Sequence, residues 1–296
     1  MPQISALAGV AALALSPLVF APPALAQLPP LPPTLELTYT TYAAGFTTLR
    51  LTADLALTPN GYQLSLTYRT VGTIGFFLPG HDTASAEGTW RGDAPAPSEF
   101  ASEGIWSGRS YGVEMDYPDG APQVLQITPP QAGLREKVPP ALRRNTIDTA
   151  SAMALLLRRM IEGEGCDLSV RVFDGRRLIA FTARTAGTEI LAPTTRSFFH
   201  GPAIRCDITG RMLAGFLLSE SPAERTRPHN GAVWFAHPIP GLPLLPVRIA
   251  FDTKWFTAAT MYLTNITAGP HLPPPLPEDL AQARTAAESP RAAAAH

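Results

Sequence analysis

Residue types that commonly carry catalysis occur in this chain, but their spacing matches no familiar catalytic motif. A serine nucleophile on a strained turn needs the pattern Gly-x-Ser-x-Gly, and Ser107 has its neighbouring glycines at a different spacing. The pair His81–Asp82 is the most suggestive acid–base dyad, yet adjacent residues on a β-strand point to opposite faces. We therefore expect no enzymatic activity. The enzymatic alternative is a hydrolase whose residues come together from distant segments.

The two cysteines, Cys166 and Cys206, raise three possibilities: a metal site, a catalytic thiol or a disulfide. A structural zinc site needs four ligands, and neither cysteine has another Cys or His at ligand spacing. A catalytic thiol needs a paired histidine, which the sequence does not identify. We therefore expect a disulfide that closes a loop of about 40 residues and stabilises the fold by about 4 kcal/mol. We expect no metal and no cofactor.

The N-terminus has the features of an export signal. An apolar stretch from Ala6 to Phe20 leads to Ala24-Leu25-Ala26, which places small residues at the two positions that a signal peptidase reads. The stretch is short and interrupted by proline, unlike a membrane span, and no later segment approaches spanning length. One feature argues against a signal, since no Lys or Arg precedes the stretch, and the alternatives are a retained anchor or a misplaced start codon. We expect cleavage after Ala26 and export to an oxidising compartment, where a disulfide is stable.

Composition excludes one class of partner and sets the size of the fold. The chain has 296 residues, of which 45% are hydrophobic and 16% charged, and its formal net charge is −1. This length and apolar content are enough for one large domain with an ample core. Basic residues are scattered rather than clustered in a stripe, so we expect no nucleic-acid partner.

Alternating apolar and polar residues from Thr34 onward predict β-strands. Residues 34–57 form a hairpin pattern around Ala43-Ala44-Gly45, and Pro59-Asn60-Gly61 marks the next turn. Further runs of strand-like sequence follow at 62–71, 83–90, 99–106, 109–117 and 123–128. Their regular spacing favours a large antiparallel sheet over alternating strands and helices.

One helix interrupts the strand pattern, at residues 148–162. Its apolar face includes Met153, Leu157 and Met160, and apolar residues on other sides predict a well-buried helix. Asp148 is the expected N-cap, accepting from the backbone N–H of Ser151. The alternative for these two residues is a buried acid–hydroxyl pair.

The strand pattern returns after Cys166. Asp174-Gly175 predicts a tight hairpin, and Thr209-Gly210 predicts the turn of a second strand pair. The ordered part ends near Ile266, so we expect one β-rich domain over 34–266 that surrounds the helix. We expect a Pro-rich linker at 27–33 and a mobile Pro/Ala-rich tail at 267–296.

Two further features have both a structural and a functional interpretation. The glycine-rich segment 71–80 carries Ile74, Phe76 and Phe77. It either crosses the core as a strand, or lines the mouth of a half-barrel, or touches a membrane surface. Arg176-Arg177 is either an exposed pair beside the hairpin turn or a site for an anionic head group.

Four segments resemble a bacterial envelope family known as domain of unknown function 3108. They occur in the family's order across most of the chain: Tyr68–Gly88, Arg135–Arg158, Cys166–Arg177 and Gly201–Phe216. Members of this family typically carry an export signal. The resemblance implies a periplasmic location and an open, curved β-architecture, and it supplies no catalytic residues.

Together these features predict a non-enzymatic periplasmic protein with a large curved antiparallel sheet, an open or half barrel, around one central helix. If the helix leaves part of the concavity empty, an apolar ligand such as a lipid fits there. The residues expected to bind it are Ile74, Phe76, Phe77, Met153, Leu157, Met160, Arg176 and Arg177. The alternative is an interaction module that docks an envelope protein through a sheet edge or the Pro-rich tail. A concave apolar cavity favours the first function, and a filled core with an exposed edge favours the second.

Overall fold

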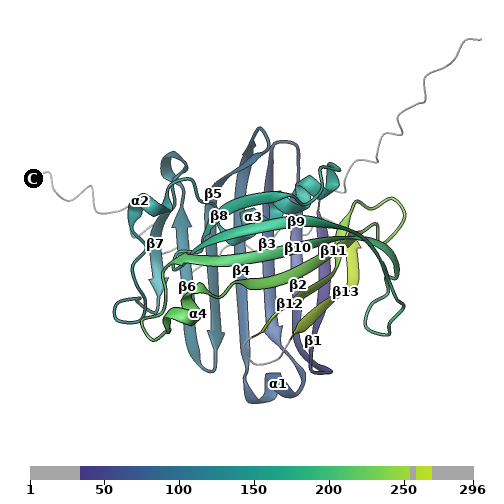
Figure 1. Cartoon of the computed structure of the whole chain (residues 1–296), viewed down its shortest axis with the longest axis horizontal. Helices are drawn as coiled ribbons and strands as arrows, with labels where there is room; N and C mark the ends of the chain where they lie inside the picture. Colours follow the sequence, from purple (N-terminus) through teal and green to yellow (C-terminus); the bar gives the residue numbers. More distant parts are fainter. Residues whose placement is uncertain (1–33, 254–257, 269–296) are drawn as a thin grey trace, which may run out of the picture. The chain divides into compact units, whose positions relative to one another are not determined.

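Alternating sequence patterns build thirteen β-strands in the part of the chain that the computed structural model describes, residues 34–253 and 258–268. All thirteen belong to one sheet, and every strand pair in it is antiparallel (Figure 1). The strands are β1 (Leu35–Ala43), β2 (Phe46–Leu57), β3 (Gly61–Thr70), β4 (Gly80–Arg91), β5 (Ala94–Trp106), β6 (Arg109–Asp116), β7 (Gln123–Thr128), β8 (Leu168–Phe173), β9 (Leu178–Leu191), β10 (Gly201–Ala214), β11 (His229–Ala236), β12 (Leu245–Phe251) and β13 (Ala259–Ala268).

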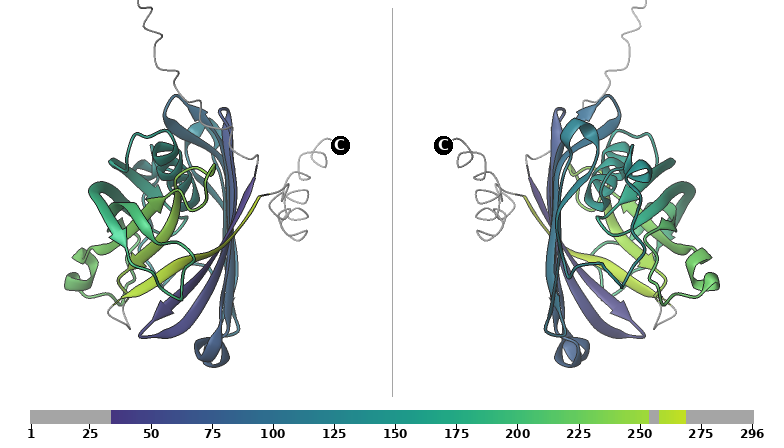
Figure 2. Two further views of the ribbon diagram at one scale, coloured as in Figure 1. Left: turned by 90° about the vertical axis from the view of Figure 1, so that its right-hand side faces the viewer. Right: turned by 90° about the vertical axis from the view of Figure 1, so that its left-hand side faces the viewer.

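The strand order explains how one sheet makes two walls. The order is β7-β6-β5-β4-β3-β2-β1-β13-β12-β11-β10-β9-β8, so β1 and β13 pair in the middle and β7 and β8 lie at the two ends. In Figure 1 the later strands, in green, cross in front of the early strands, in purple and blue, and Figure 2 shows the two sets side by side as two walls. The predicted fold class, mainly β with a curved antiparallel sheet around one central helix, is confirmed.

The long helix α3 (Thr149–Ile161) lies between the two walls and contacts β3, β4, β5, β8 and β12. Asp148 is its N-cap, as predicted, because its carboxylate accepts from the backbone N–H of Ser151. Leu157 and Met160 are buried in the hydrophobic core that α3 shares with both walls. No helix among the described residues is long and apolar enough to cross a membrane.

The disulfide Cys166–Cys206 connects the segment after α3 to β10 in the second wall, with 5.9 Å between the two Cα atoms. Both cysteines are fully buried, and the Sγ of Cys206 lies 4.0 Å from the Sδ of Met160. The predicted pairing is therefore present, and it fixes the C-terminal end of the helix to the sheet.

The two ends of the sheet meet without a continuous ladder. Arg176, in the turn between β8 and β9, donates from its guanidinium to the carbonyl oxygens of Gly112, Thr128 and Pro129 beside β6 and β7. Gly175 packs so closely on Val113 that a Cβ there would clash with a Val113 methyl group, and its φ of +82° also favours glycine. Side-chain and turn contacts thus close the sheet where strand pairing does not.

Two sequence predictions are wrong. Residues 201–214 form one strand, β10, rather than a pair that turns at Thr209-Gly210. Gly210 there lies in the ladder opposite Phe181 and stays extended.

The possibility that 71–80 crosses the core as a strand is also wrong. Gly72 has φ +62°, and a Cβ at this position would lie 2.9 Å from the carbonyl oxygen of Thr47. The chain therefore turns there into the short helix α1 (Gly72–Phe77).

Three short helices complete the described chain: η1 (Pro118–Gly120), α2 (Pro140–Arg143) and α4 (Pro222–Thr226). The last strand, β13, continues to Ala268, two residues beyond the predicted end of the domain. The predicted signal peptide, the linker at 27–33 and residues 269–296 of the predicted tail lie outside the described residues.

Candidate functional site

A groove of about 1240 Å³ lies between the end strand β8 and the hairpin formed by β4 and β5. Residues 168–171 of β8 line one side, and residues 93–99 together with η1 line the other. Leu155 and Arg159 of α3 form the floor, and residues 145–147 close one end. The groove therefore joins both walls of the sheet to the central helix.

The side of the groove formed by β8 is an open strand edge. Among the described residues, its backbone pairing on this side is one parallel bridge, in which Ile147 donates to the carbonyl of Arg171 at 3.1 Å and accepts from the N–H of Phe173 at 2.9 Å. Backbone groups of alternate residues point to the same side of a strand. The N–H and C=O of Ser169 and the N–H of Arg171 therefore point toward the groove, away from β9.

The opposite side is a strand edge that two prolines protect. The ladder between β5 and β6 begins at Glu99, so residues 94–98 extend beyond it. Pro95 and Pro97 in this extension have no N–H to offer. Proline is a common means of blocking pairing at a sheet edge. Of the two sides of the groove, β8 is thus the one whose free backbone N–H groups can pair with an added strand.

A buried polar cluster supports the floor at the N-terminus of α3. The Asp148 carboxylate accepts from the N–H of Ser151 at 2.7 Å, from the Ser151 hydroxyl at 2.6 Å and from the Tyr117 hydroxyl at 3.2 Å. Tyr62 of β3 donates to the Ser151 hydroxyl at 2.7 Å. Burial raises the pKa of Asp148, Tyr62 and Tyr117 above their ordinary values.

Both sequence interpretations of Asp148 and Ser151 are therefore correct, since the cap is also a buried acid–hydroxyl pair. Asp148 and Ser151 are fully buried, and their neighbours Tyr62 and Tyr117 are also buried. The Ser151 hydroxyl donates to Asp148, so its proton is already engaged. The cluster attaches α3 to β3 and to Tyr117, the residue after β6. It therefore fixes the position of the helix that forms the groove floor.

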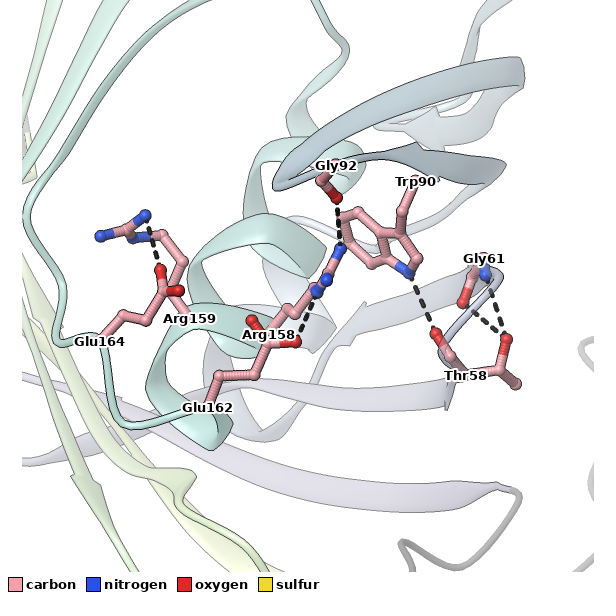
Figure 3. Close-up of polar contacts among 8 residues, drawn as sticks. All are labelled: Thr58, Gly61, Trp90, Gly92, Arg158, Arg159, Glu162 and Glu164. Atoms are coloured by element: carbon pink, nitrogen blue, oxygen red, sulfur yellow. Dashed lines mark hydrogen bonds and ion pairs between the residues drawn. The ribbon is translucent and has the colours of Figure 1, made fainter.

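A second set of contacts holds the β4–β5 hairpin against α3 (Figure 3). The Arg158 guanidinium lies 4.5 Å from the centre of the Trp90 ring and donates to the carbonyl of Gly92 at 3.2 Å. Trp90 in turn donates to the carbonyl of Thr58 at 3.1 Å. On the same helix, Arg158 pairs with Glu162 at 2.7 Å. These contacts join the wall of the groove to its floor.

The charges in the groove favour a neutral or basic occupant. Its lining has five acidic and three basic side chains. Among the cations, Arg159 pairs with Glu164 at 2.9 Å, and Arg171 donates to the carbonyl of Leu142. Among the acids, Asp167 pairs with Arg184 at 3.8 Å, and Glu87 accepts from the Gln63 amide at 3.2 Å. The acidic residues are Glu87, Asp93, Glu99, Asp116 and Asp167.

The structure does not bring the predicted ligand-binding residues together. Leu157 and Met160 are buried in the core, and Met153 is 48% exposed. Ile74, Phe76 and Phe77 are in α1, which follows the end of β3. Tyr62, which contacts α3, is at the start of β3, so α1 lies about 26 Å further along the strand direction. A ligand role for these residues remains a prediction.

The two arginines after the hairpin turn have structural partners. Arg176 donates to three backbone carbonyls, and burial lowers the pKa of its guanidinium. Arg177 pairs with Asp174 at 2.7 Å. The dyad His81–Asp82 does not form a unit either. His81 is exposed, whereas Asp82 is half-buried beside Tyr68, which fits the expectation of opposite faces.

Sequence reasoning missed the groove itself. Its sides come from 93–99 and 168–171, which are about 70 residues apart and meet only because the sheet curves. One signal was present. Prolines at 95 and 97 within an otherwise strand-like stretch indicate an edge that must avoid pairing.

Comparison with known proteins identifies the family to which the chain belongs. One solved structure, a β-barrel-like protein of domain of unknown function DUF1849 from Brucella abortus, has a TM-score of 0.48 and 11% identity, and the match covers 81% of this chain and 98% of that one. A candidate lipoprotein from Parabacteroides distasonis has a TM-score of 0.32 and 10% identity, with 80% and 97% covered. No curated protein matches the chain. The family model described as protein of unknown function (DUF3108) matches residues 34–264, and the chain therefore belongs to this family.

Proposed function

We propose that this protein is an exported, non-enzymatic interaction module of the bacterial cell envelope, which binds an extended peptide segment of a partner protein along β8. The observation that carries the proposal is the groove of about 1240 Å³ beside an open strand edge. Addition of a strand to a sheet edge is a common mode of peptide recognition, because the backbone hydrogen bonds supply affinity without a particular sequence.

The groove indicates what such a peptide looks like. Its backbone pairs with the N–H and C=O of Ser169 and with the N–H of Arg171. Alternate side chains of an added strand point to opposite faces. One set faces the apolar side chains of Leu155, Ile147 and Val170, and the other faces the acidic rim. We therefore expect peptides that alternate apolar with neutral or basic residues.

The interior of the sheet around α3 supports an interaction module over a ligand carrier. Leu157 and Met160 are among the residues that fill the space between the walls, with 8% and 1% exposure. Phe76 and Phe77 lie away from this core. A filled core with an exposed edge is the arrangement that favours docking of a protein partner.

Three observations support a periplasmic location. The disulfide Cys166–Cys206 requires an oxidising compartment to persist. The first 26 residues have the pattern of a cleaved signal peptide. The chain also belongs to a family whose members we expect to be exported.

The direct test uses the edge of β8. We would select random twelve-residue peptides by display on the purified protein, and then measure binding of the enriched peptides to two variants. Ser169→Pro removes an edge N–H without removing a hydrogen bond of the β8–β9 ladder, whereas Ser169→Ala keeps the N–H and removes only the hydroxyl. Arg171→Pro, compared with Arg171→Ala, repeats the test at the next edge position. Circular dichroism confirms that each variant is folded.

We expect the selected peptides to bind the wild type and the alanine variants alike, and to bind the proline variants at least about tenfold more weakly. Peptides that bind Ser169→Pro and Arg171→Pro as tightly as the wild type would contradict strand addition. A selection that enriches no peptide sequence would contradict peptide binding altogether.

A second candidate function is binding of an apolar ligand such as a lipid in the part of the concavity beyond α3. Here the strands carry half-buried apolar side chains two positions along from core residues: Leu51, Leu66, Phe181, Ile208, Ile249 and Met261. Organic extraction of protein purified from the periplasm, followed by mass spectrometry, tests this function. A stoichiometric apolar molecule, absent from an envelope protein of similar size, supports it, and a clean extract contradicts it.

A further inference from the structure

Large apolar side chains gather at the end of the sheet where α1 lies, at the bottom of Figure 1. Phe76 is 81% exposed and Phe77 72%, and their rings meet edge to face with 5.1 Å between centroids. Phe46 begins β2 at the tip of the neighbouring hairpin and is 63% exposed. We call these residues, together with Leu78 and Ile105, the α1 rim. Contiguous exposed apolar groups of this kind commonly mark an interaction site.

Backbone hydrogen bonds join the three tips that carry the α1 rim. The N–H of Val71 donates to the carbonyl of Thr48 at 3.0 Å, which attaches α1 to the start of β2. The N–H of Ser107, in the β5–β6 turn, donates to the carbonyl of Pro79 at 3.0 Å. The apolar side chains are therefore presented by a fixed scaffold, and their exposure is a property of the folded state.

Two arginines and a histidine form a row beside the α1 rim on the outer face of the sheet. In the strand register, Arg50 is opposite Arg69, and Arg69 is opposite His81. All three side chains are exposed, and within residues 34–253 and 258–268 none of them forms an ion pair. Like charges directly opposite each other destabilise a sheet, so this row has a cost in the free protein. On the same face, the acidic residue Glu103 is opposite Thr83. Thr83 is the next outward-facing residue of β4 after His81, so Glu103 lies further from the tip than the row does.

We propose that the α1 rim docks the protein onto an anionic phospholipid surface. Arg50 is four residues from Phe46, and Arg69 is three residues before Gly72, which places the two arginines about 10–13 Å behind the tip. When aromatic side chains enter the boundary between head groups and acyl chains, cations at this height meet the phosphate layer. The apolar tip and the two arginines thus match the two layers of a membrane surface, and the anionic lipid relieves the repulsion between the arginines.

Co-sedimentation with vesicles tests this docking. The purified protein is mixed with vesicles of phosphatidylglycerol and phosphatidylcholine, or of phosphatidylcholine alone. Phe76→Ser/Phe77→Ser removes the apolar tip, and Ile190→Ser, at a 75% exposed apolar position on β9, is its matched control. Arg50→Gln/Arg69→Gln removes the charge, and Arg211→Gln, at an exposed arginine on β10, is the control for it.

We expect binding to vesicles that contain phosphatidylglycerol, a loss of at least about tenfold in Phe76→Ser/Phe77→Ser, and a loss of about fivefold for each arginine removed. Salt at high concentration weakens the interaction, since exposed charges are screened. Both controls bind like the wild type, and so does Ser169→Pro, because the groove lies elsewhere.

Three results would overturn the proposal. One is the absence of binding to anionic vesicles. Another is binding that the serine or glutamine substitutions leave unchanged. The last is a dimer in sedimentation velocity that Phe76→Ser/Phe77→Ser dissociates, because the α1 rim would then be the interface between two copies of this chain.

Discussion

Asp148 and Asp82 show how aspartate takes two different roles in one protein, one at the start of α3 and one in β4. Asp148 is fully buried and bonded on several sides, so it serves as a fixed cap for α3. Asp82 is only half-buried, on the concave side of β4 beside Tyr68. Burial raises the pKa of Asp82 to about 6, although hydrogen bonding with Tyr68 acts in the opposite direction.

The raised pKa of Asp82 makes folding depend on pH. An unfolded aspartate ionises near pH 3.9, whereas Asp82 in the folded protein ionises near pH 6. The folded state holds the proton more tightly, so the free energy of unfolding decreases as pH rises from about 4 to about 6 and then levels off. We expect Asp82→Asn to show a smaller decrease in urea unfolding experiments at pH 4, 5, 6 and 7. An unchanged slope would contradict this assignment. Burial also raises the pKa of Asp148, which contributes to the slope in the same direction.

At the residue scale the sequence was informative where a role depends on near neighbours. The N-cap at Asp148 and the tight turn at Asp174-Gly175 follow from local backbone chemistry, and both are present. The other members of the cluster come from elsewhere in the chain: Tyr117, which donates to Asp148, follows β6, and Tyr62, which donates to Ser151, is in β3. No local pattern indicates these partners.

At the scale of elements, the contact between α3 and the β4–β5 hairpin joins one side of the groove to its floor. Arg158 and Trp90 form its centre, where the guanidinium lies over the indole ring (Figure 3). A cation near the face of a tryptophan ring contributes about 0.5–2 kcal/mol. Weakening this contact affects both stability and the position of the hairpin.

A double-mutant cycle measures the contact. We expect Trp90→Leu and Arg158→Met to be non-additive, with a coupling of about 0.5–2 kcal/mol in the free energy of unfolding from urea titrations. Trp90→Leu combined with Arg196→Met serves as the control, since Arg196 packs on Tyr42 instead, and this pair should be additive. Additivity of the first pair would show that α3 does not hold the hairpin.

The elements that the sequence predicted incorrectly share a physical cause. Glycine marked a turn at 209–210, but Gly210 stays extended inside β10, where the neighbouring strands impose the conformation. In 71–80 the apolar residues indicated burial, but the tight approach of Gly72 to Thr47 directs the chain into α1 and leaves Phe76 and Phe77 outside. In both places contacts between strands, rather than local preference, decide the structure.

For the whole molecule, the important feature is that one sheet closes on itself through the turn at Gly175 and Arg176. We expect Arg176→Met to lower the free energy of unfolding by about 1.5–3 kcal/mol, because carbonyls beside β6 and β7 lose a charged donor. Arg177→Met is the matched control, and its loss is below about 1 kcal/mol, because the Arg177–Asp174 pair is partly exposed. Equal effects of the two substitutions in urea unfolding would contradict the closing role of Arg176.

The curvature that creates the groove is a property of the whole sheet. Composition and strand spacing predicted a large antiparallel sheet around a helix, and this prediction is confirmed. They did not predict that residues 94–98 would face β8, because that proximity depends on the accumulated twist of thirteen strands and on the closure at Arg176. The candidate site is therefore a consequence of the fold and not of a motif.

The most direct test of the account is amide hydrogen exchange at the edge of β8, followed by NMR with and without a peptide selected on the groove. Strand addition predicts that exchange of the Ser169 and Arg171 amides slows markedly when the peptide binds, while Val170 and Val172, which already pair with β9, change little. Unchanged exchange at Ser169 and Arg171 in the saturated complex would show that the peptide does not pair with this edge, and the proposed function would be wrong.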